Sequence, residues 1–260
     1  MNILSVVDQG TFDGCLDDDP RYYWVLKNMD FEEWASSNSS DMLWLSGPPQ
    51  SGIRGISECI VDFSTRRSRE EQTSVLYFFG SSVSQEKPAL TIFVHSLLSQ
   101  FMGSSPEEER MSIAKAFLRG LLETKLRASD SQRLYFDTRV AWEEETKKIL
   151  HARSNELWAG LKGALTSNTK RKFSIVVDGL SDLEHQEKGF VLELFVFLSQ
   201  LQERNVSVKA LLTSRQHDGV EMEGLRIIEY DKERQGLIRY HMLKIDKTNN
   251  YSMSCCPSLR

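Results

Sequence analysis

A glycine-rich segment has the spacing of a phosphate-binding loop. Gly47 and Gly52 match the two glycines of the pattern G-x-x-x-x-G-K-[ST], in which backbone N–H groups wrap phosphates, the lysine reaches the outer phosphates and the hydroxyl binds Mg²⁺. Here Ile53 occupies the lysine position and Arg54 the hydroxyl position. The pattern predicts a nucleotide site without two of its chemical groups. Its candidate binding residues are Gly47, Pro48, Pro49, Gln50, Ser51, Gly52, Ile53 and Arg54.

An acidic segment follows a second apolar run. Asp178 comes directly after Phe173 to Val177, and Asp182 follows four residues later. An aspartate at the carboxyl end of a strand lies where parallel α/β sheets bind ligands, and in phosphate-transferring enzymes it holds Mg²⁺. Asp178 is therefore the candidate Mg²⁺ ligand, and Asp178 and Asp182 are the candidate catalytic residues. The competing interpretation is an ordinary Asp-Gly turn.

A third polar segment closes another apolar run. Thr213 and Arg215 follow Val208 to Leu212, where they could sense a terminal phosphate. A plain change from strand to loop would look the same. The shared position of the three segments, each at the end of an expected strand, favours a common site over coincidence.

The elements that must position these residues alternate along the chain. Short apolar runs predict strands at about 42–45, 75–79, 173–177, 208–212 and 227–230. Helical spacing of apolar residues predicts helices at about 53–66, 88–101 and 190–201, with two more between 105 and 167 and a polar loop at 128–139. This alternation predicts an α/β fold with a parallel sheet covered on both faces.

Composition narrows the function classes. The 260 residues are 40% hydrophobic and carry a net charge of -5, which gives no overall attraction to nucleic acid or to an anionic membrane. The four cysteines contain no C-x-x-C pair, and the five histidines have no metal-binding spacing. No apolar window approaches the ~20 residues that span a bilayer. We expect a soluble, cytoplasmic protein without nucleic-acid or membrane partners.

Several short motifs together resemble one family, the fungal NACHT-type STAND NTPases, in the subgroup with a nephrocystin-like N-terminal domain. The resemblance covers about Thr11 to Leu243. The motifs that carry it are Thr11-Phe12-Asp13, Phe31-Glu32-Glu33-Trp34, Leu43-Trp44-Leu45-Ser46-Gly47-Pro48-Pro49, Tyr77-Phe78-Phe79, Leu97-Leu98-Ser99-Gln100-Phe101, Val177-Asp178-Gly179-Leu180 and Thr213-Ser214-Arg215.

The resemblance implies a P-loop NTPase fold, a three-layer sandwich around five mostly parallel strands. It also implies that the Walker A and Walker B strands are separated by the strand that leads into Thr213. The expected organisation is an N-terminal flank docked on the core (1–40), the P-loop domain (41–230), and the start of a helical linker with a loose tail (231–260). The chain departs from the family at Ile53 and Arg54, and at Ser181-Asp182, where the family has an acidic pair.

These departures lead to an expected function. Family members act as nucleotide-dependent switches in signalling, so the resemblance implies a regulatory module that works through protein partners and is compatible with oligomerisation. The degenerate Walker A predicts impaired ATP hydrolysis and weak or no binding of ATP or GTP with Mg²⁺. Two alternatives stay open: an active switch that uses Arg54 or a relocated lysine (Lys87, Lys172 or Lys209), and a truncated fragment of a larger repeat-containing NACHT protein.

Overall fold

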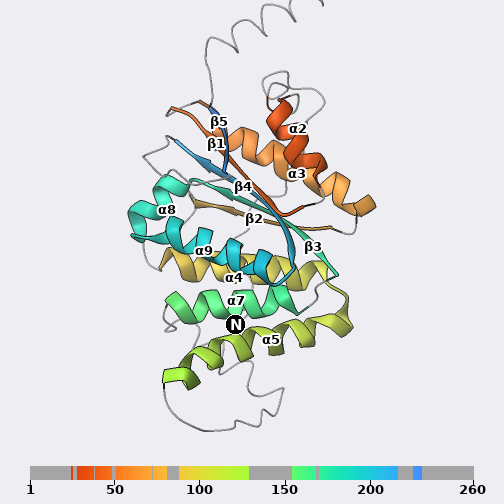
Figure 1. The fold of residues 1–260 in the computed structure, drawn as a ribbon, viewed down its shortest axis with the longest axis vertical. Helices are drawn as coiled ribbons and strands as arrows, with labels where there is room; N and C mark the ends of the chain where they lie inside the picture. The colour runs from red at the N-terminus through yellow and green to blue at the C-terminus, as the bar shows by residue number, and fades with distance from the viewer. Residues whose placement is uncertain are drawn as a thin grey trace, which may run out of the picture.

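A five-stranded parallel sheet forms the centre of the computed structural model (Figure 1). The structure describes residues 25, 28–37, 39–48, 51–71, 73–80, 88–128, 154–167, 170–215 and 225–229. The strands are β1 (Asp41–Ser46), β2 (Thr73–Phe79), β3 (Lys172–Asp178), β4 (Ser207–Ser214) and β5 (Arg226–Glu229), in the order β2-β3-β4-β1-β5. Every neighbouring pair runs parallel. The predicted α/β fold with a five-stranded sheet is confirmed.

The apolar runs form strands because helices cover both faces of the sheet. In β3 every residue from Phe173 to Asp178 is buried, as expected for a central parallel strand. Successive residues of β1 point to opposite faces. Leu43 and Leu45 pack in one hydrophobic cluster, whereas Trp44 packs in the other.

The helices are arranged in layers (Figure 1). On one face of the sheet lie α2 (Met29–Ser36) and α3 (Ile53–Glu71). On the other face lie α4 (Ala89–Ser104), α8 (Leu180–Gln186) and α9 (Phe190–Glu203). Beyond α4, α7 (Ser154–Thr166) packs against α5 (Glu107–Ala128). The fold therefore has three layers, with the sheet between two layers of helices. Helices α5 and α7 lie outside the layer that contains α4.

Both hydrophobic clusters are rich in aromatic side chains. On the α2 and α3 face, Phe31 and Trp34 of α2 pack with Leu43 and Ile56. The start of α2 is fixed by Asn28, whose Oδ1 accepts hydrogen bonds from the backbone N–H groups of Asp30 and Phe31. On the opposite face, rings from β2, α4, α7 and α9 pack together around Phe93. The loops at the carboxyl edge are thus held by a sheet that is packed on both sides.

Some elements differ from the sequence prediction. The helix that begins at Ile53 continues to Glu71, beyond the expected end near Arg66. The segment after Asp178 forms the short helix α8 rather than only a turn, because Leu180 and Leu183 bury their side chains there. Gly179 makes this change of direction with a φ of 79°, which glycine adopts without strain. Predictions for residues 1–24, 129–153 and 230–260 lie outside the described residues.

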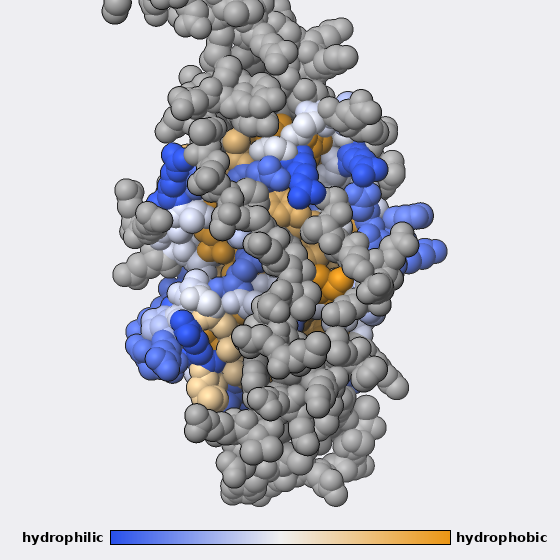
Figure 2. All heavy atoms as spheres, turned by 180° about the vertical axis from the view of Figure 1, so that it is seen from behind, coloured by the Kyte–Doolittle hydropathy of each residue, from blue (hydrophilic) through white to orange (hydrophobic). Residues whose placement is uncertain are grey.

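Neither hydrophilic nor hydrophobic side chains dominate the visible surface of the described residues (Figure 2). Seen from behind, the described residues mix strongly hydrophilic side chains with smaller hydrophobic areas (Figure 2). Among the described helices, none combines the length and the apolar character that crossing a bilayer requires.

Candidate functional site

The three polar segments meet at the carboxyl edge of the sheet. Strand β4 lies between β1 and β3, so the segment that contains Thr213 separates the glycine-rich loop from Asp178. Ser46 at the end of β1 is aligned with Ser214, and Val177 is aligned with Leu212. The strand order therefore places Asp178 and Thr213 side by side. This is the strand arrangement that the family resemblance implied.

Asp178 lies in a buried cluster with two hydroxyl groups. Its Oδ1 is 2.5 Å from the Thr213 hydroxyl and 2.9 Å from the Ser57 hydroxyl, and both hydroxyls can donate to it. The two hydroxyl oxygens are 3.3 Å apart. Ser57 and Thr213 are fully buried, and Asp178 is 5% exposed. We call these three residues the Asp178 cluster.

Ser57 is the member that the sequence prediction missed. It lies one helical turn after Ile53 in α3, and its hydroxyl also lies 3.2 Å from the Ile53 carbonyl oxygen. Since residues four apart share one face of a helix, Ser57 points toward the sheet just behind the loop. The phosphate-binding pattern requires a hydroxyl at position 54 and specifies no residue at position 57. Motif spacing alone could therefore not identify Ser57.

Burial raises the pKa of the Asp178 carboxyl above its ordinary value. The hydrogen bonds from Thr213 and Ser57 and the positive charge of Arg54 oppose this effect, while the negative charge of Glu58 adds to it. Desolvation dominates because the ionised form loses water that the two hydroxyls replace only in part. The site therefore stabilises the protonated form of the Asp178 carboxyl relative to the same group in water. A carboxyl that binds a metal ion must instead be ionised.

The raised pKa predicts how stability depends on pH. The contribution of Asp178 to stability is fully present below its ordinary pKa of 3.8 and is lost as the pH rises through the higher folded pKa. Asp178→Asn keeps an acceptor oxygen but cannot ionise. We expect the free energy of unfolding of the native chain, relative to this variant, to fall as the pH rises from the ordinary pKa of 3.8 through the higher folded pKa. Urea unfolding at several pH values measures this difference, and a difference that does not change with pH contradicts the prediction.

The glycine-rich loop is tied to β4 at its base. The backbone N–H of Gly47 donates to the carbonyl of Ser214 at 3.2 Å, and the Trp44 indole N–H donates to the Ser214 hydroxyl at 2.8 Å. A turn follows, in which the Ser51 N–H donates to the carbonyl of Pro48 at 3.1 Å. Gly52 has a φ of 77°, which favours glycine just before α3 begins. Pro49 and Gln50 lie outside the described residues.

The side chains at the two altered positions take different environments. Ile53, at the sequence position of the P-loop lysine, is apolar and buried, with 8% exposure. The Arg54 side chain is 52% exposed, with its Nε 3.1 Å from a carboxylate oxygen of Glu58 and its guanidinium carbon 5.4 Å from the centre of the Phe79 ring. A guanidinium group has no acceptor atom and cannot bind Mg²⁺.

Asp182 and Arg215 form an ion pair at the rim of the site. Their side chains are 3.2 Å apart and are 29% and 62% exposed. An exposed pair of this kind adds little stability. No hydrogen bond joins Asp182 to the Asp178 cluster within the described residues, and no described group of three His, Cys, Asp or Glu residues could hold a metal ion. If Mg²⁺ binds, Asp178 is the carboxylate placed to receive it.

The lysines of β3 and β4 are too far from the glycine-rich loop for their side chains to reach it. Lys172 begins β3, and Lys209 lies near the start of β4 with its Nζ 2.6 Å from the Ala35 carbonyl oxygen. At ~3.3 Å per residue along a strand, Lys209 is ~13 Å and Lys172 ~20 Å from the carboxyl edge. The relocated-lysine alternative is wrong for these two residues. Lys87 lies outside the described residues.

Comparison with known proteins identifies the family of this chain. The structure of C. elegans PCH-2 matches with 14% sequence identity and a TM-score of 0.32, over 84% of this chain and 41% of that chain. The chain thus spans less than half the length of that structure. No curated protein matches the sequence. The family model described as Nephrocystin 3, N-terminal, matches residues 21–215, a range that includes the glycine-rich loop and the Asp178 cluster. The chain therefore belongs to the nephrocystin 3 N-terminal family.

Proposed function

We propose that this chain is a regulatory module of the NACHT-like STAND type, with a degenerate Walker A, that does not hydrolyse ATP and binds nucleotide weakly or not at all. The Asp178 cluster carries this proposal. In an active P-loop site, Mg²⁺ lies between the phosphates, a hydroxyl and water held by the aspartate. Here Ser57 and Thr213 both hydrogen-bond Oδ1, one of the two carboxylate oxygens of Asp178. Metal binding through this oxygen would have to displace hydrogen bonds that are already made, which leaves Oδ2 as the ligand atom.

The first turn of α3 supports the same conclusion. The free N–H groups of a helix N-terminus favour an anion by only about 0.3–1 kcal/mol, or ~2 when partly buried. A lysine would add a charge-assisted contact worth about 1.5–3 kcal/mol. Ile53 cannot make that contact, because its side chain is apolar and is buried, with 8% exposure.

A module of this type acts through its contacts rather than through turnover. We propose protein partners as its ligands. Leu192 and Val196 lie one turn apart on α9 and are 67% and 48% exposed. Apolar side chains that remain exposed on a well-packed helix are suited to a partner surface, and they support this part of the proposal.

The test is nucleotide binding and turnover by the native chain. We expect calorimetry with Mg·ATP and Mg·GTP to give no saturable binding tighter than ~1 mM. We also expect no steady-state ATP hydrolysis above that of the Asp178→Asn variant, which keeps the shape of the carboxyl group. Turnover in the native chain that is lost in this variant would refute the proposal.

Arg54 supplies the second candidate function. Its positive charge affects the pKa of Asp178, and its side chain is half exposed, so it could turn to grip a phosphate. Tight ATP binding that disappears in Arg54→Ala would identify an active nucleotide switch instead. Glu58→Ala, which removes the carboxylate that pairs with Arg54 and leaves Arg54 in place, is the matched control and should keep such binding.

A further inference from the structure

A groove of about 700 Å³ runs along α7, with side chains of α5 and α9 on its two sides. Helix α7 lies between α9 and α5 (Figure 1). The residues of α7 that line the groove extend from Asn155 to Thr166, which is ~17 Å at ~1.5 Å per residue. This length corresponds to about three turns of an α-helix. We call this surface the α7 groove.

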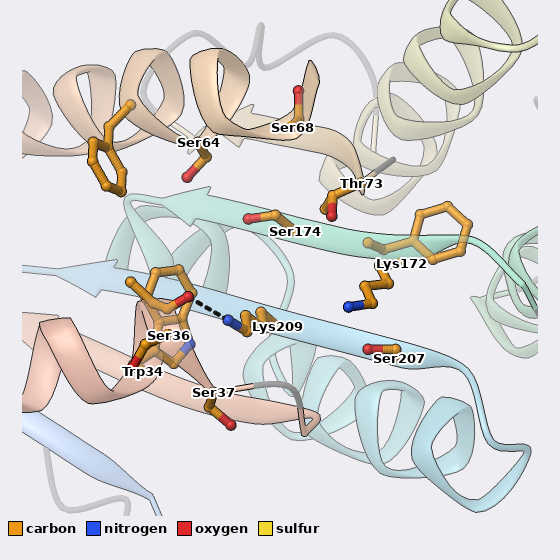
Figure 3. A pocket seen from close by; sticks show the side chains of 13 residues that line it. Trp34, Ser36, Ser37, Ser64, Ser68, Thr73, Lys172, Ser174, Ser207 and Lys209 are labelled. Carbon is orange, nitrogen blue, oxygen red and sulfur yellow. Dashed lines mark hydrogen bonds between the residues drawn. The ribbon is translucent and has the colours of Figure 1, made fainter. Parts of the chain in front are cut away.

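A second, smaller pocket has a different character. It has a volume of about 60 Å³ and lies between α2, α3 and the first residues of β2, β3 and β4 (Figure 3). Trp34, Lys172 and Lys209 line it, but the Lys209 amine already donates a hydrogen bond to the Ala35 carbonyl oxygen. The α7 groove, in contrast, combines exposed apolar side chains with charged groups of both signs.

The floor of the α7 groove forms where α5 and α7 cross closely. A Cβ atom on Gly120 would lie 2.3 Å from the Ala159 carbonyl oxygen, and one on Gly163 would lie 2.5 Å from that of Ala116. The crossing therefore requires small residues, and these four line the groove. Helix α5 runs antiparallel to α7, since Ala116 precedes Gly120 whereas its neighbour Gly163 follows Ala159.

One wall of the groove is apolar. Leu192 and Val196 of α9 line it and are 67% and 48% exposed. They lie one turn apart, so both side chains share one face of the helix. The wall is supported from below by Trp158 and Phe197, whose ring centres are 4.9 Å apart. Two apolar side chains at this spacing match the apolar face of an amphipathic helix laid into a groove.

The end of the groove beside the start of α7 is acidic. Glu193 of α9 lines this end, and its carboxylate accepts hydrogen bonds from the Ser154 hydroxyl at 2.5 Å and the Trp158 indole N–H at 2.7 Å. Glu123 of α5 is exposed and lies at the same end, because α5 runs antiparallel to α7. Two carboxylates from different helices therefore flank this end.

The opposite end of the groove is basic. Lys162 of α7 donates to the Gln200 side-chain oxygen at 2.7 Å, so α9 runs in the same direction as α7 and Arg204 lies beside the end of α7. Lys162 and Arg204 both line the groove. Arg119 lines it on the α5 side, one turn before Glu123 and hence nearer to the basic end. The charges thus change sign along the groove.

We propose that the α7 groove binds an amphipathic α-helix of a partner protein, with a basic amino-terminal end and an acidic carboxyl-terminal end. The apolar face of this helix packs on Leu192 and Val196. Its basic end lies at Glu123 and its acidic end at Arg204. The helix dipole has the same polarity, positive at the amino terminus and negative at the carboxyl terminus. The inference rests on the proposed role of this chain as a module that acts through protein partners, and adds the form and direction of the partner segment.

The experiment tests the direction of the bound helix with fluorescein-labelled peptides of about twelve residues, the length of the groove. Each peptide is stapled into a helix and carries two leucines one turn apart. The peptides differ only in whether lysines or glutamates occupy the first and last turns. We expect the peptide with lysines first and glutamates last to bind the native chain about tenfold more tightly in fluorescence anisotropy than the reversed peptide, because reversal places like charges together at both ends.

Variants of the groove make the test specific. Glu123→Lys, Arg204→Glu changes the charge of one exposed residue at each end and should remove or invert the preference. Leu192→Ala should weaken binding of the preferred peptide by about tenfold. Met111→Ala is the matched control, since Met111 is 48% exposed on α5 and is not among the residues that line the groove, and it should bind as the native chain does.

The outcomes separate this proposal from the proposed function. The groove proposal is overturned if no peptide binds, if the two charge patterns bind equally, or if Leu192→Ala leaves the affinity unchanged. Self-association of the native chain that Leu192→Ala abolishes would assign the groove to a second copy and also overturn it. ATP turnover that depends on Asp178 would refute the proposed function, but it would leave a positive peptide result intact.

Discussion

The double variant Ile53→Lys, Arg54→Ser is expected to bind Mg·ATP one to two orders of magnitude more tightly than the native chain. The new lysine would restore a charge-assisted phosphate contact worth about 1.5–3 kcal/mol, and each 1.4 kcal/mol is a factor of about ten in affinity. The new serine would supply the hydroxyl that the metal needs. The base of the loop is tied to β4, since the Gly47 backbone N–H and the Trp44 indole N–H both donate to Ser214.

The control separates charge from shape. Ile53→Met, Arg54→Ser has the same serine and a long unbranched side chain in place of lysine, but no charge. We expect this variant to bind Mg·ATP as weakly as the native chain does in calorimetry. Equal and tight binding by the native chain and both variants would show that Ile53 and Arg54 do not limit affinity, and the proposed loss of the site would be wrong.

Replacing Phe93 by Ala is expected to lower the free energy of unfolding by about 3–5 kcal/mol. Phe93 of α4 is fully buried. Its ring centre lies 5.2 Å from that of Phe78, 5.3 Å from that of Phe190 and 5.5 Å from that of Trp158. The side chain thus connects β2, α4, α7 and α9, and its loss would leave a cavity that these elements cannot close together.

Urea unfolding measures this effect, with Leu192→Ala as the control. Leu192 is 67% exposed on α9, so its truncation should change stability by no more than ~0.5 kcal/mol. A loss below about 1 kcal/mol for Phe93→Ala would mean that the aromatic cluster repacks around the missing ring.

The strand pattern was the most informative part of the sequence. Apolar runs followed by polar residues placed Asp178 and Thr213 at strand ends, and the structure brings both to one edge because β3 and β4 are neighbours. The sequence pattern did not predict the role of Ser57. A serine inside a helix is unremarkable in a sequence, and only the crossing of α3 over the ends of β3 and β4 brings its hydroxyl to Asp178.

Other features depended on contacts that no local pattern contains. The short helix α8 forms because Leu180 and Leu183 find buried positions, which the sequence of a turn does not reveal. Lys172 and Lys209 are far apart along the chain, and it is the parallel pairing of β3 with β4 that places both beside Trp34 in one pocket. Contacts between residues far apart in the sequence, rather than local secondary-structure propensity, determine both features.

The position of β1 has a consequence for how the protein is made. Both strands that flank it, β4 and β5, come late in the chain, and β4 begins about 160 residues after β1 ends. At roughly 5–20 residues per second, a ribosome needs on the order of 10–30 s to produce that interval. Throughout this time Leu43, Trp44 and Leu45 have no strand to pair with, although all three are buried in the finished sheet. Until β4 emerges, the nascent chain therefore carries an apolar strand, interior in the finished sheet, without either of its two neighbours.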